Sequence, residues 1–389
     1  MIPYGKQTVD QSDINAVLEV LESDFLTQGP VTPGFEKEIC KYTGSNHSVA
    51  VINATSALHI ACLALGVGNQ DIVWTSPISF VASANCAKYC GAEVDFVDID
   101  PNTYNMSVQA LEEKLKIAKQ KNRLPKVIIP VHLSGQSCDM EAISKLGEQY
   151  GFRIIEDASH AIGGSYKSSK VGSCQYSDIC VFSFHPVKII TTCEGGVCTT
   201  NDKELYQKMY NLRSHGIVRN QEDMQNTKHG LWYYEQVDLG FNYRLNDLQA
   251  ALGISQLKKL NNFVEKRLLI AKKYDKIFQE ETDLKLPFQA KQSISSFHLY
   301  ILRIKKDGNL DRKVIFEKLR NNGILVNIHY IPIYRHPFYS KDYLIENFPN
   351  AESYYEEAIS LPIFPGLTDD QIEYVAETLK KPTNYQNIF

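Results

Sequence analysis

Short apolar runs alternate with stretches of helical periodicity between about residues 45 and 215 of this 389-residue chain. Seven runs have the length and the β-branched content of buried strands. They are SVAVIN, DIVWTSP, EVDFVDID, KVIIPVHLSG, RIIEDASHA, DICVFSF and GGVCTT. Strands separated by helices are typical of βαβ units, so the pattern predicts an α/β fold with a large, mostly parallel, seven-stranded sheet.

The pattern changes after about residue 205. Residues 205–275 are charged and helical in periodicity, with LQAALGISQLKKL as the clearest amphipathic stretch, and we expect a long helix that links two domains. From Phe297 an apolar run, HLYILRI, precedes a helical segment, DRKVIFEKLRNNG, and a second apolar run, ILVNIHYIPI. We therefore expect an N-terminal arm and large domain over residues 1–255, and a smaller α+β domain over residues 256–389.

Composition narrows the classes of function. The chain carries 41 basic and 45 acidic residues, a net charge of -4, without a strongly basic block. Nucleic acid and anionic membrane surfaces are therefore not expected partners. The start, MIPYGKQTVDQSDI, lacks the features of a signal peptide, and no run of about 18 apolar residues occurs. Nine cysteines without a CxxC pair fit reduced thiols, and we expect a cytoplasmic protein without a metal site.

Two polar residues follow neighbouring predicted strands. Asp157 closes the run RIIED, and Lys188 comes just after DICVFSF, where ligand crevices of open α/β sheets form. Most lysines are simply solvated, but this one lies among Ser183, His185 and the glycines of residues 194–196, which suit close backbone approach to an anion. Pyridoxal phosphate needs a lysine amine for its aldehyde and a carboxylate for its ring nitrogen. Lys188 and Asp157 are therefore candidates for these two roles.

A candidate phosphate site follows the first predicted strand. Thr55 and Ser56 stand at the start of the helical segment LHIACLALG, where free amides and the helix dipole favour an anion. Either residue could instead serve only as a helix cap. Phe80, in SPISFVASAN, is a candidate for stacking on the pyridine ring, or else a core phenylalanine. Neither GxGxxG after the first strand nor GxxxxGK[ST] occurs, so nicotinamide and nucleoside triphosphate cofactors have no local signature.

Taken together, these motifs resemble the sugar aminotransferases of the DegT/DnrJ/EryC1/StrS family, which have the aspartate aminotransferase fold, fold type I of the pyridoxal phosphate enzymes. The matching segments span nearly the whole chain. They are LTQGP, NATSALH, TSPISFVASAN, EDASHA, FSFHPVK with its following EGG, LRSHG, GFNYRLNDLQAALG and HYIPIY. Within the family, SFHPVK followed by ITTCEGG, with IPYGKQ and SDFLTQG near the start, is most similar to members that act in pseudaminic acid biosynthesis.

The resemblance implies roles for individual residues. Lys188 would form the Schiff base, Asp157 would pair with the pyridine nitrogen, and Phe80 would stack on the ring. His160, at a position often filled by glutamine in the family, would lie near the cofactor's phenolic oxygen. Thr55, Ser56 and Ser183 would bind the phosphate, and Asn242 would reach into the site of a neighbouring subunit. The residues implied to line the nucleotide-sugar site are Tyr4, Asp24, Phe25, Leu26, Thr27, Ala54, Ser183, Asn242, Asn327, Ile328, His329 and Tyr330.

The activity that the resemblance implies is transfer of an amino group from L-glutamate to C4 of a UDP-4-keto-6-deoxy-N-acetylhexosamine, by a homodimer with shared active sites. Other family activities stay open: a bacillosamine-type or dTDP-sugar 4- or 3-aminotransferase. A sugar 3-dehydratase of the family would have histidine in place of Lys188. A non-catalytic sensor is the alternative from a different class, although no appended DNA-binding module is visible.

Overall fold

A seven-stranded sheet forms the centre of the protein, for which a computed structural model describes residues 1–220, 222, 224–225 and 230–381. Strand β10 runs antiparallel to both of its neighbours, and the other pairs are parallel. The strands, in spatial order, are β2 (His47–Val51), β10 (Gly196–Thr200), β9 (Ile179–Ser183), β6 (Arg153–Asp157), β5 (Val127–Ile129), β3 (Ile72–Thr75) and β4 (Glu93–Phe96). Each predicted run overlaps one of them, which confirms the α/β class and the mostly parallel sheet.

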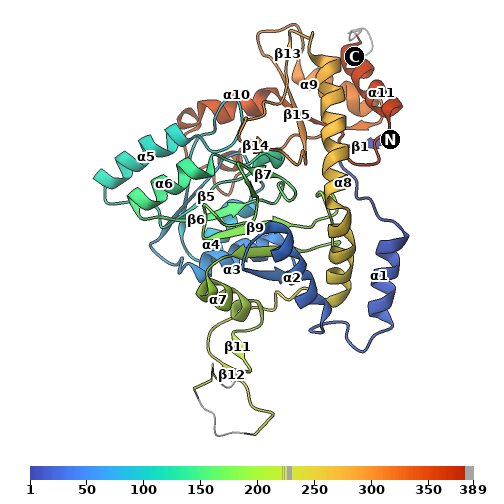
Figure 1. Ribbon diagram of the computed structural model, residues 1–389. Helices are drawn as coiled ribbons and strands as arrows, with labels where there is room; N and C mark the ends of the chain where they lie inside the picture. The colour runs from blue at the N-terminus through green and yellow to red at the C-terminus, as the bar shows by residue number, and fades with distance from the viewer. Residues whose placement is uncertain (221, 223, 226–229, 382–389) are drawn as a thin grey trace.

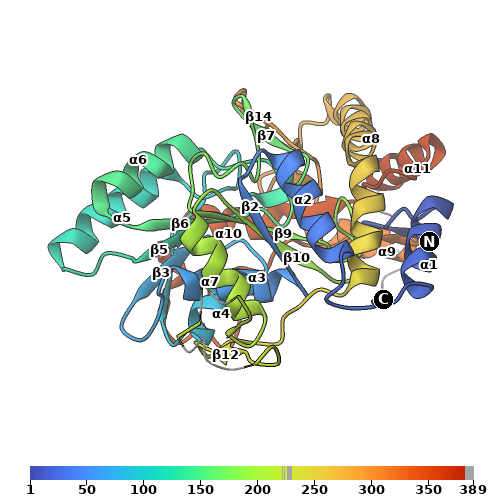
Figure 2. The same cartoon turned by 60° about the horizontal axis from the view of Figure 1, so that its bottom comes forward.

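Helices cover both faces of the sheet (Figures 1 and 2). The covering helices are α2 (Val31–Thr43), α3 (Ala54–Ala64), α4 (Ala82–Tyr89), α5 (Val108–Gln120), α6 (Met140–Tyr150), α7 (Lys203–Arg213) and α8 (Asp247–Phe278). Because side chains alternate along a strand, Ile129 and Ile155 pack with α3, α4 and α7, whereas Ile128 and Ile154 pack with α5 and α6. Helices α2 and α8 cover the rest of that second face.

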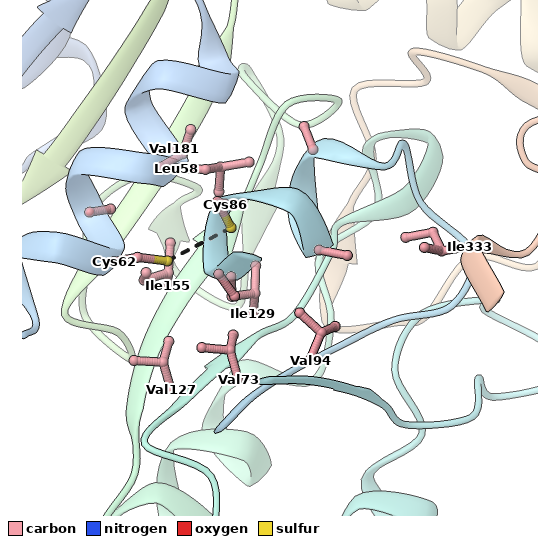
Figure 3. Packing of buried hydrophobic residues seen from close by; sticks show 14 of the residues in the cluster. Leu58, Cys62, Val73, Cys86, Val94, Val127, Ile129, Ile155, Val181 and Ile333 are labelled. Carbon is pink, nitrogen blue, oxygen red and sulfur yellow. Dashed lines mark hydrogen bonds between the residues drawn. The ribbon is translucent and has the colours of Figure 1, made fainter. Parts of the chain in front are cut away.

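Helix α3 is apolar around most of its circumference, because it is wedged between the sheet, α4 and α7. Figure 3 shows Leu58 and Cys62 of α3 against Cys86 of α4 and the strand residue Val181. The Cys62 and Cys86 sulfurs are 3.7 Å apart and fully buried, so these thiols pack as small hydrophobic groups. The core thus holds the two helices whose N-terminal ends border the candidate site.

A second core surrounds a three-stranded antiparallel sheet near the C-terminus. Tyr274 and Phe278, near the end of α8, pack into it. The predicted linking helix is therefore present, and the expected division at residue 255 lies inside it; that division stays a prediction. The elements of this region are β13 (Leu284–Lys285), β15 (Tyr300–Ile304), β17 (Ala358–Leu361), α9 (Arg312–Asn321), α10 (Pro349–Glu357) and α11 (Asp369–Lys380).

The N-terminal segment joins the C-terminal region. Strand β1 (Ile2–Pro3) pairs in parallel with β16 (Ile324–Leu325), and α1 (Gln11–Leu21) packs along α8. The second apolar run, ILVNIHYIPI, contributes the strand β16 and an isolated bridge from Asn327 to Ser360, and Pro332 near its end has no amide to donate to a ladder. Minor elements are β7 (Ser165–Tyr166), β8 (Ser169–Lys170), β14 (Ser293–Ile294), β11 (Ile217–Val218), β12 (Glu235–Gln236), η1 (Leu133–Gly135), η3 (Ile333–Arg335) and η4 (Ile345–Asn347).

None of the helices in the described ranges is both long enough and apolar enough to cross a bilayer.

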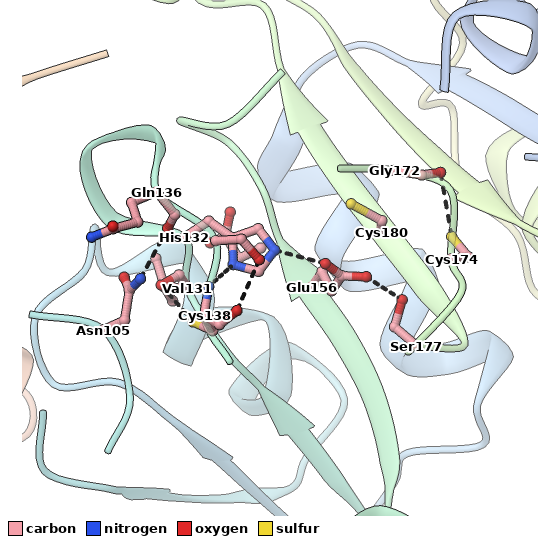
Figure 4. Close-up of polar contacts among 12 residues, drawn as sticks. Asn105, Val131, His132, Gln136, Cys138, Glu156, Gly172, Cys174, Ser177 and Cys180 are labelled. Atoms are coloured by element: carbon pink, nitrogen blue, oxygen red, sulfur yellow. Dashed lines mark hydrogen bonds and ion pairs between the residues drawn. The ribbon is translucent and has the colours of Figure 1, made fainter. Parts of the chain in front are cut away.

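A buried polar network centres on Glu156, the residue before the last of β6 (Figure 4). The backbone amide of Cys138 donates to His132 Nδ1 at 3.2 Å, so His132 Nε2 carries the proton and donates to Glu156 at 2.7 Å. The Ser177 hydroxyl donates to the other carboxylate oxygen of Glu156 at 2.5 Å. These bonds satisfy a carboxylate that is only 5% exposed, and they tie β6 to the chain after β5 and the chain before β9.

Substituting His132 with alanine should therefore lower the free energy of unfolding by about 3 kcal/mol, because it leaves the buried Glu156 without its imidazole donor. Urea unfolding followed by circular dichroism would measure the change. Lys116→Ala, which breaks an exposed ion pair with Glu112, is the matched control and should cost no more than about 1 kcal/mol. Equal losses in the two variants would contradict the importance of the buried network.

Candidate active site

A cavity of about 560 Å³ opens at the carboxyl ends of β6 and β9. Asp157 is the last residue of β6, and Lys188 follows β9 after a four-residue connection, so the two side chains meet at the same edge of the sheet. Most of the predicted site residues line this cavity. They are Tyr4, Ala54, Thr55, Phe80, Asp157, His160, Ser183, Lys188, Asn327, Ile328, His329 and Tyr330.

Three hydroxyls orient the Asp157 carboxylate, which is 5% exposed. Ser83 donates to one carboxylate oxygen at 2.6 Å, and Ser159 donates to the other at 2.6 Å. Ser79 and Ser83 are in turn linked by a hydrogen bond of 2.7 Å. These side chains lie in the predicted motifs SPISFVASAN and EDASHA, but their role as supports for Asp157 was not predicted. The carboxylate is thus held in one orientation at the floor of the cavity.

Lys188 lies on a tight turn after β9. Its backbone amide donates to the His185 carbonyl at 2.9 Å, and the Thr192 amide closes the loop onto the Phe184 carbonyl at 3.0 Å. Desolvation lowers the pKa of Lys188 from 10.5 to about 8, although the nearby Asp157 carboxylate opposes this shift. A substantial fraction of the amine is therefore neutral near physiological pH, as a nucleophile or a general base requires.

Histidines and a tyrosine surround the lysine. Burial, Lys188 and His329 hold the pKa of His160 well below its ordinary value, and burial and Lys188 lower that of His329 to about 3. The His160 Nε2 and Tyr330 hydroxyl are 3.0 Å apart. Burial raises the pKa of Tyr330, so its hydroxyl keeps its proton. These rings accordingly offer neutral donors and acceptors beside one amine and one carboxylate.

The N-terminus of α3 forms another wall of the cavity. Asn53 is the N-cap, and its side chain accepts from the Ser56 amide at 2.9 Å, so neither Thr55 nor Ser56 is needed as a cap. The start of β10 lies close by: a Cβ on Gly196 would come within 2.6 Å of the Asn53 carbonyl carbon. Glycine is therefore required where β10 meets a helix end suited to an anion.

The N-terminal arm brings Tyr4 to the opposite wall. Pairing of β1 with β16 places Tyr4 beside the segment 327–330, and the Tyr4 and His329 rings have centroids 4.9 Å apart. His329 Nδ1 is 2.8 Å from the Ser360 hydroxyl, which fixes the ring within the wall. Residues from the two ends of the chain therefore complete the cavity.

Six of the predicted site residues do not line this cavity in the described parts of the single chain. Ser56 is buried behind the helix terminus, and the loop residues Asp24, Phe25, Leu26 and Thr27 are exposed. Asn242 is also exposed and forms a bridge to Ser214. Their predicted contacts with ligands stay predictions. In the described residues, no group of three or more histidine, cysteine or acidic side chains is arranged to hold a metal ion.

The residues present fit pyridoxal phosphate. Lys188 supplies a partly neutral amine, Asp157 supplies a carboxylate fixed by hydroxyl donors, and the α3 terminus supplies an anion site. Phe80 is 59% exposed and lines the cavity, where it is available for stacking and is not a core residue.

Comparisons with known proteins agree with this site. Residues 7–380 match the model of the DegT/DnrJ/EryC1/StrS aminotransferase family. The chain is 40% identical over 382 residues to UDP-4-amino-4,6-dideoxy-N-acetyl-beta-L-altrosamine transaminase of Campylobacter jejuni, covering 97% of this chain and 96% of that protein.

Similar solved structures are also aminotransferases. Helicobacter pylori PseC, an aminotransferase involved in the biosynthesis of pseudoaminic acid, superimposes with a TM-score of 0.88 at 35% identity, covering 97% of this chain and 98% of that one. The sugar aminotransferase Spr1654 of Streptococcus pneumoniae, solved in PMP and PLP forms, is 29% identical with a TM-score of 0.88 for the PMP form and coverage of 98% of both chains. The chain is thus a pyridoxal phosphate-dependent aminotransferase belonging to the DegT/DnrJ/EryC1/StrS family.

Proposed function

We propose that this enzyme transfers an amino group from L-glutamate to C4 of UDP-2-acetamido-2,6-dideoxy-β-L-arabino-hex-4-ulose, in the cytoplasm, as a step of pseudaminic acid biosynthesis. The observation that carries the reaction type is the meeting of Lys188 and Asp157 in one cavity. Support for the substrate comes from the names of relatives that are 35 to 40% identical over nearly the whole chain.

Lys188 performs the proton transfers in this proposal. Bound pyridoxal phosphate would supply the electron sink for these transfers and carry the amino group between the two half-reactions. Lys188 Nζ would take a proton from the α-carbon of the amino donor in the first half-reaction and deliver one to C4 of the sugar in the second. Asp157 would keep the pyridine nitrogen protonated, and its bonds from Ser83 and Ser159 fix the orientation of its carboxylate.

The nucleotide sugar would enter along the wall made by Tyr4 and segment 327–330. This wall offers ring surface, the Tyr4 hydroxyl and the exposed Asn327 amide, which suit the hydroxyl and amide groups of a sugar. Asn242 lies outside the cavity of its own chain and is exposed, so it is free to complete the site of a partner subunit. This arrangement supports a homodimer with two shared active sites, in which Asp24 to Thr27 face the substrate.

The reactivity of Lys188 should depend on pH. Only the neutral amine attacks the cofactor's aldehyde, and a pKa near 8 makes that form available at lower pH than the ordinary 10.5. The rate at which the cofactor-free enzyme gains its visible absorption band on addition of pyridoxal phosphate should thus rise with pH and level off above about 8. Because Asp157 raises this pKa, Asp157→Asn should move the midpoint to lower pH. A midpoint near 10.5 in both proteins would contradict the assignment.

Mass spectrometry with a panel of substrates tests the proposed function. The purified enzyme would be incubated with pyridoxal phosphate, glutamate and UDP-4-keto-6-deoxy-N-acetylhexosamines that differ in configuration at C5, with a dTDP-4-keto sugar as a further member. We expect amination of the L-arabino sugar alone. Preference for the D-xylo isomer would indicate a bacillosamine-type enzyme, and preference for the dTDP sugar would exclude the proposed substrate. Absence of any amination would exclude the proposed substrate and leave only the aminotransferase family assignment.

A further inference from the structure

His298 is a buried histidine next to the candidate active site. It lies in the segment between β14 and β15, in the C-terminal region, and is 3% exposed. Its ring centroid is 4.3 Å from that of His160, with an angle of 50° between the ring planes. His298 Nδ1 has no hydrogen-bond partner in the described part of the chain. The ring therefore contacts the active-site histidine through packing, without a bond from this nitrogen.

The contacts of His160 define its tautomer. The Ser134 amide donates to His160 Nδ1 at 3.3 Å, which makes that nitrogen an acceptor. In the neutral ring the proton is then on Nε2, at 3.0 Å from the Tyr330 hydroxyl and on the side of the cavity. A donor is thereby directed at the place where the ring oxygen of bound pyridoxal phosphate is expected.

Backbone contacts hold His298 against His160. The Ser296 hydroxyl donates to the His160 carbonyl at 3.0 Å, and the Ser296 amide donates to the Gly135 carbonyl at 3.1 Å. A Cβ on Gly135 would lie 2.9 Å from the Phe297 amide, so glycine permits this close approach. On the other side, Arg267 of α8 donates to the Phe297 and His298 carbonyls at 3.2 Å each. The His298 backbone is thus held from two directions.

Burial and nearby charges keep both rings neutral. Burial, followed by His160, Lys188, Arg267 and His329, holds the pKa of His298 well below its ordinary value. A protonated His298 would add a further positive charge to this group of basic residues. With His298 neutral, His160 can also stay neutral and still donate a hydrogen bond.

We propose that His298 is a positioning residue of the active site: its ring fixes the His160 ring so that His160 Nε2–H stays on the cavity side, beside Tyr330, where it can donate to the ring oxygen of bound pyridoxal phosphate. This inference rests on the proposed assignment of Lys188 and His160 to the cofactor, but not on the identity of the sugar. A donor at the ring oxygen would withdraw electron density that otherwise holds the proton on the adjacent nitrogen, which is Nζ of Lys188 once it has reacted with the cofactor's aldehyde. Loss of the donor should therefore raise the pH at which the visible absorption band is half changed.

Spectrophotometric pH titration of the enzyme with pyridoxal phosphate, without donor or sugar, provides the test. We expect His298→Ala to raise the midpoint of the visible band by roughly one pH unit and to weaken cofactor binding. His160→Ala should produce a shift of the same sign, and the double variant should shift no further than His160→Ala, because His298 acts through His160. His298→Phe keeps a ring against His160 and should stay near the wild-type midpoint.

Several outcomes would overturn the proposal. An unchanged midpoint in folded His298→Ala would show that His298 is only a core residue, whose loss changes the melting temperature and not the titration. Additive shifts in the double variant would show that His298 acts independently of His160. If His298→Ala does not fold, the test rests on His298→Phe. A folded His298→Phe whose visible-band midpoint is displaced by a full pH unit would exclude positioning by ring packing. Lys188→Ala should be titrated in parallel as a control for the cofactor site. If this variant retains the visible band, the assignment of Lys188 itself is wrong, and the inference about His298, which rests on it, fails with it.

Discussion

Lys188→Ala is expected to abolish transamination while the fold stays intact. The side chain lines the cavity and lies on a turn held by backbone bonds, so its removal leaves the sheet and its core unchanged. The variant loses both the amine that binds the cofactor and the base that moves the proton. Turnover should fall by about four orders of magnitude or more. Product formation by mass spectrometry and the visible spectrum of the protein with pyridoxal phosphate would measure these losses.

Lys145→Ala is the matched control for this variant. Lys145 pairs with Glu141 on the solvent side of α6, with 70% of its side chain exposed. Its loss should change neither the spectrum nor the turnover by more than about twofold. Substantial turnover in folded Lys188→Ala would show that another amine performs the chemistry.

Asp157→Asn is expected to have the second largest effect. Asparagine has nearly the same shape, but it keeps only one acceptor oxygen, so one of the bonds from Ser83 and Ser159 can still form while the other hydroxyl faces the amide NH2 group, and the negative charge beside the pyridine nitrogen is lost. The electron sink is then weaker in both half-reactions. We expect kcat to fall by roughly 10²- to 10³-fold, as for other losses of a single electrostatic contact to developing charge. Single-turnover spectrophotometry with glutamate would measure the first half-reaction.

Ser159→Ala is the control for orientation as distinct from charge. It removes one hydroxyl donor and leaves the Ser159 amide, at 3.1 Å, and the Ser83 hydroxyl on the carboxylate. The fall in kcat should be about tenfold or less, because only one of the three donors to the carboxylate is lost. If Asp157→Asn is no slower than Ser159→Ala, the charge of Asp157 is not what the reaction needs.

Local patterns predicted the sheet well. Each strand of the large sheet is an apolar run of a few residues, bounded by polar residues, and its recognition needs no distant contact. The direction of β10, in contrast, could not be predicted from the local pattern. Its sequence, GGVCTT, does not reveal that it enters the sheet antiparallel, because direction depends on the length and path of the connection from β9.

The residues of the candidate site also fall into two groups, those that local sequence patterns predicted and those that they did not. Lys188, Asp157 and the α3 terminus were predictable because each stands at the end of a strand, where parallel sheets gather ligand-binding groups. Tyr4 and segment 327–330 were assigned only by resemblance. Their meeting depends on the pairing of β1 with β16, two strands of two residues each, and such short pairs leave no pattern in the sequence.

The sequence by itself determined the α/β class, the strands, and the lysine and aspartate of a pyridoxal phosphate enzyme, because these follow from short windows of hydrophobic and polar residues. Only the tertiary structure decided which hydroxyls hold Asp157 and which ring lies behind His160. Ser83 and His298 come from segments far from their partners in the chain. Contacts of this kind are set by how α4 and the segment before β15 pack against the sheet, and packing is a property of the whole fold.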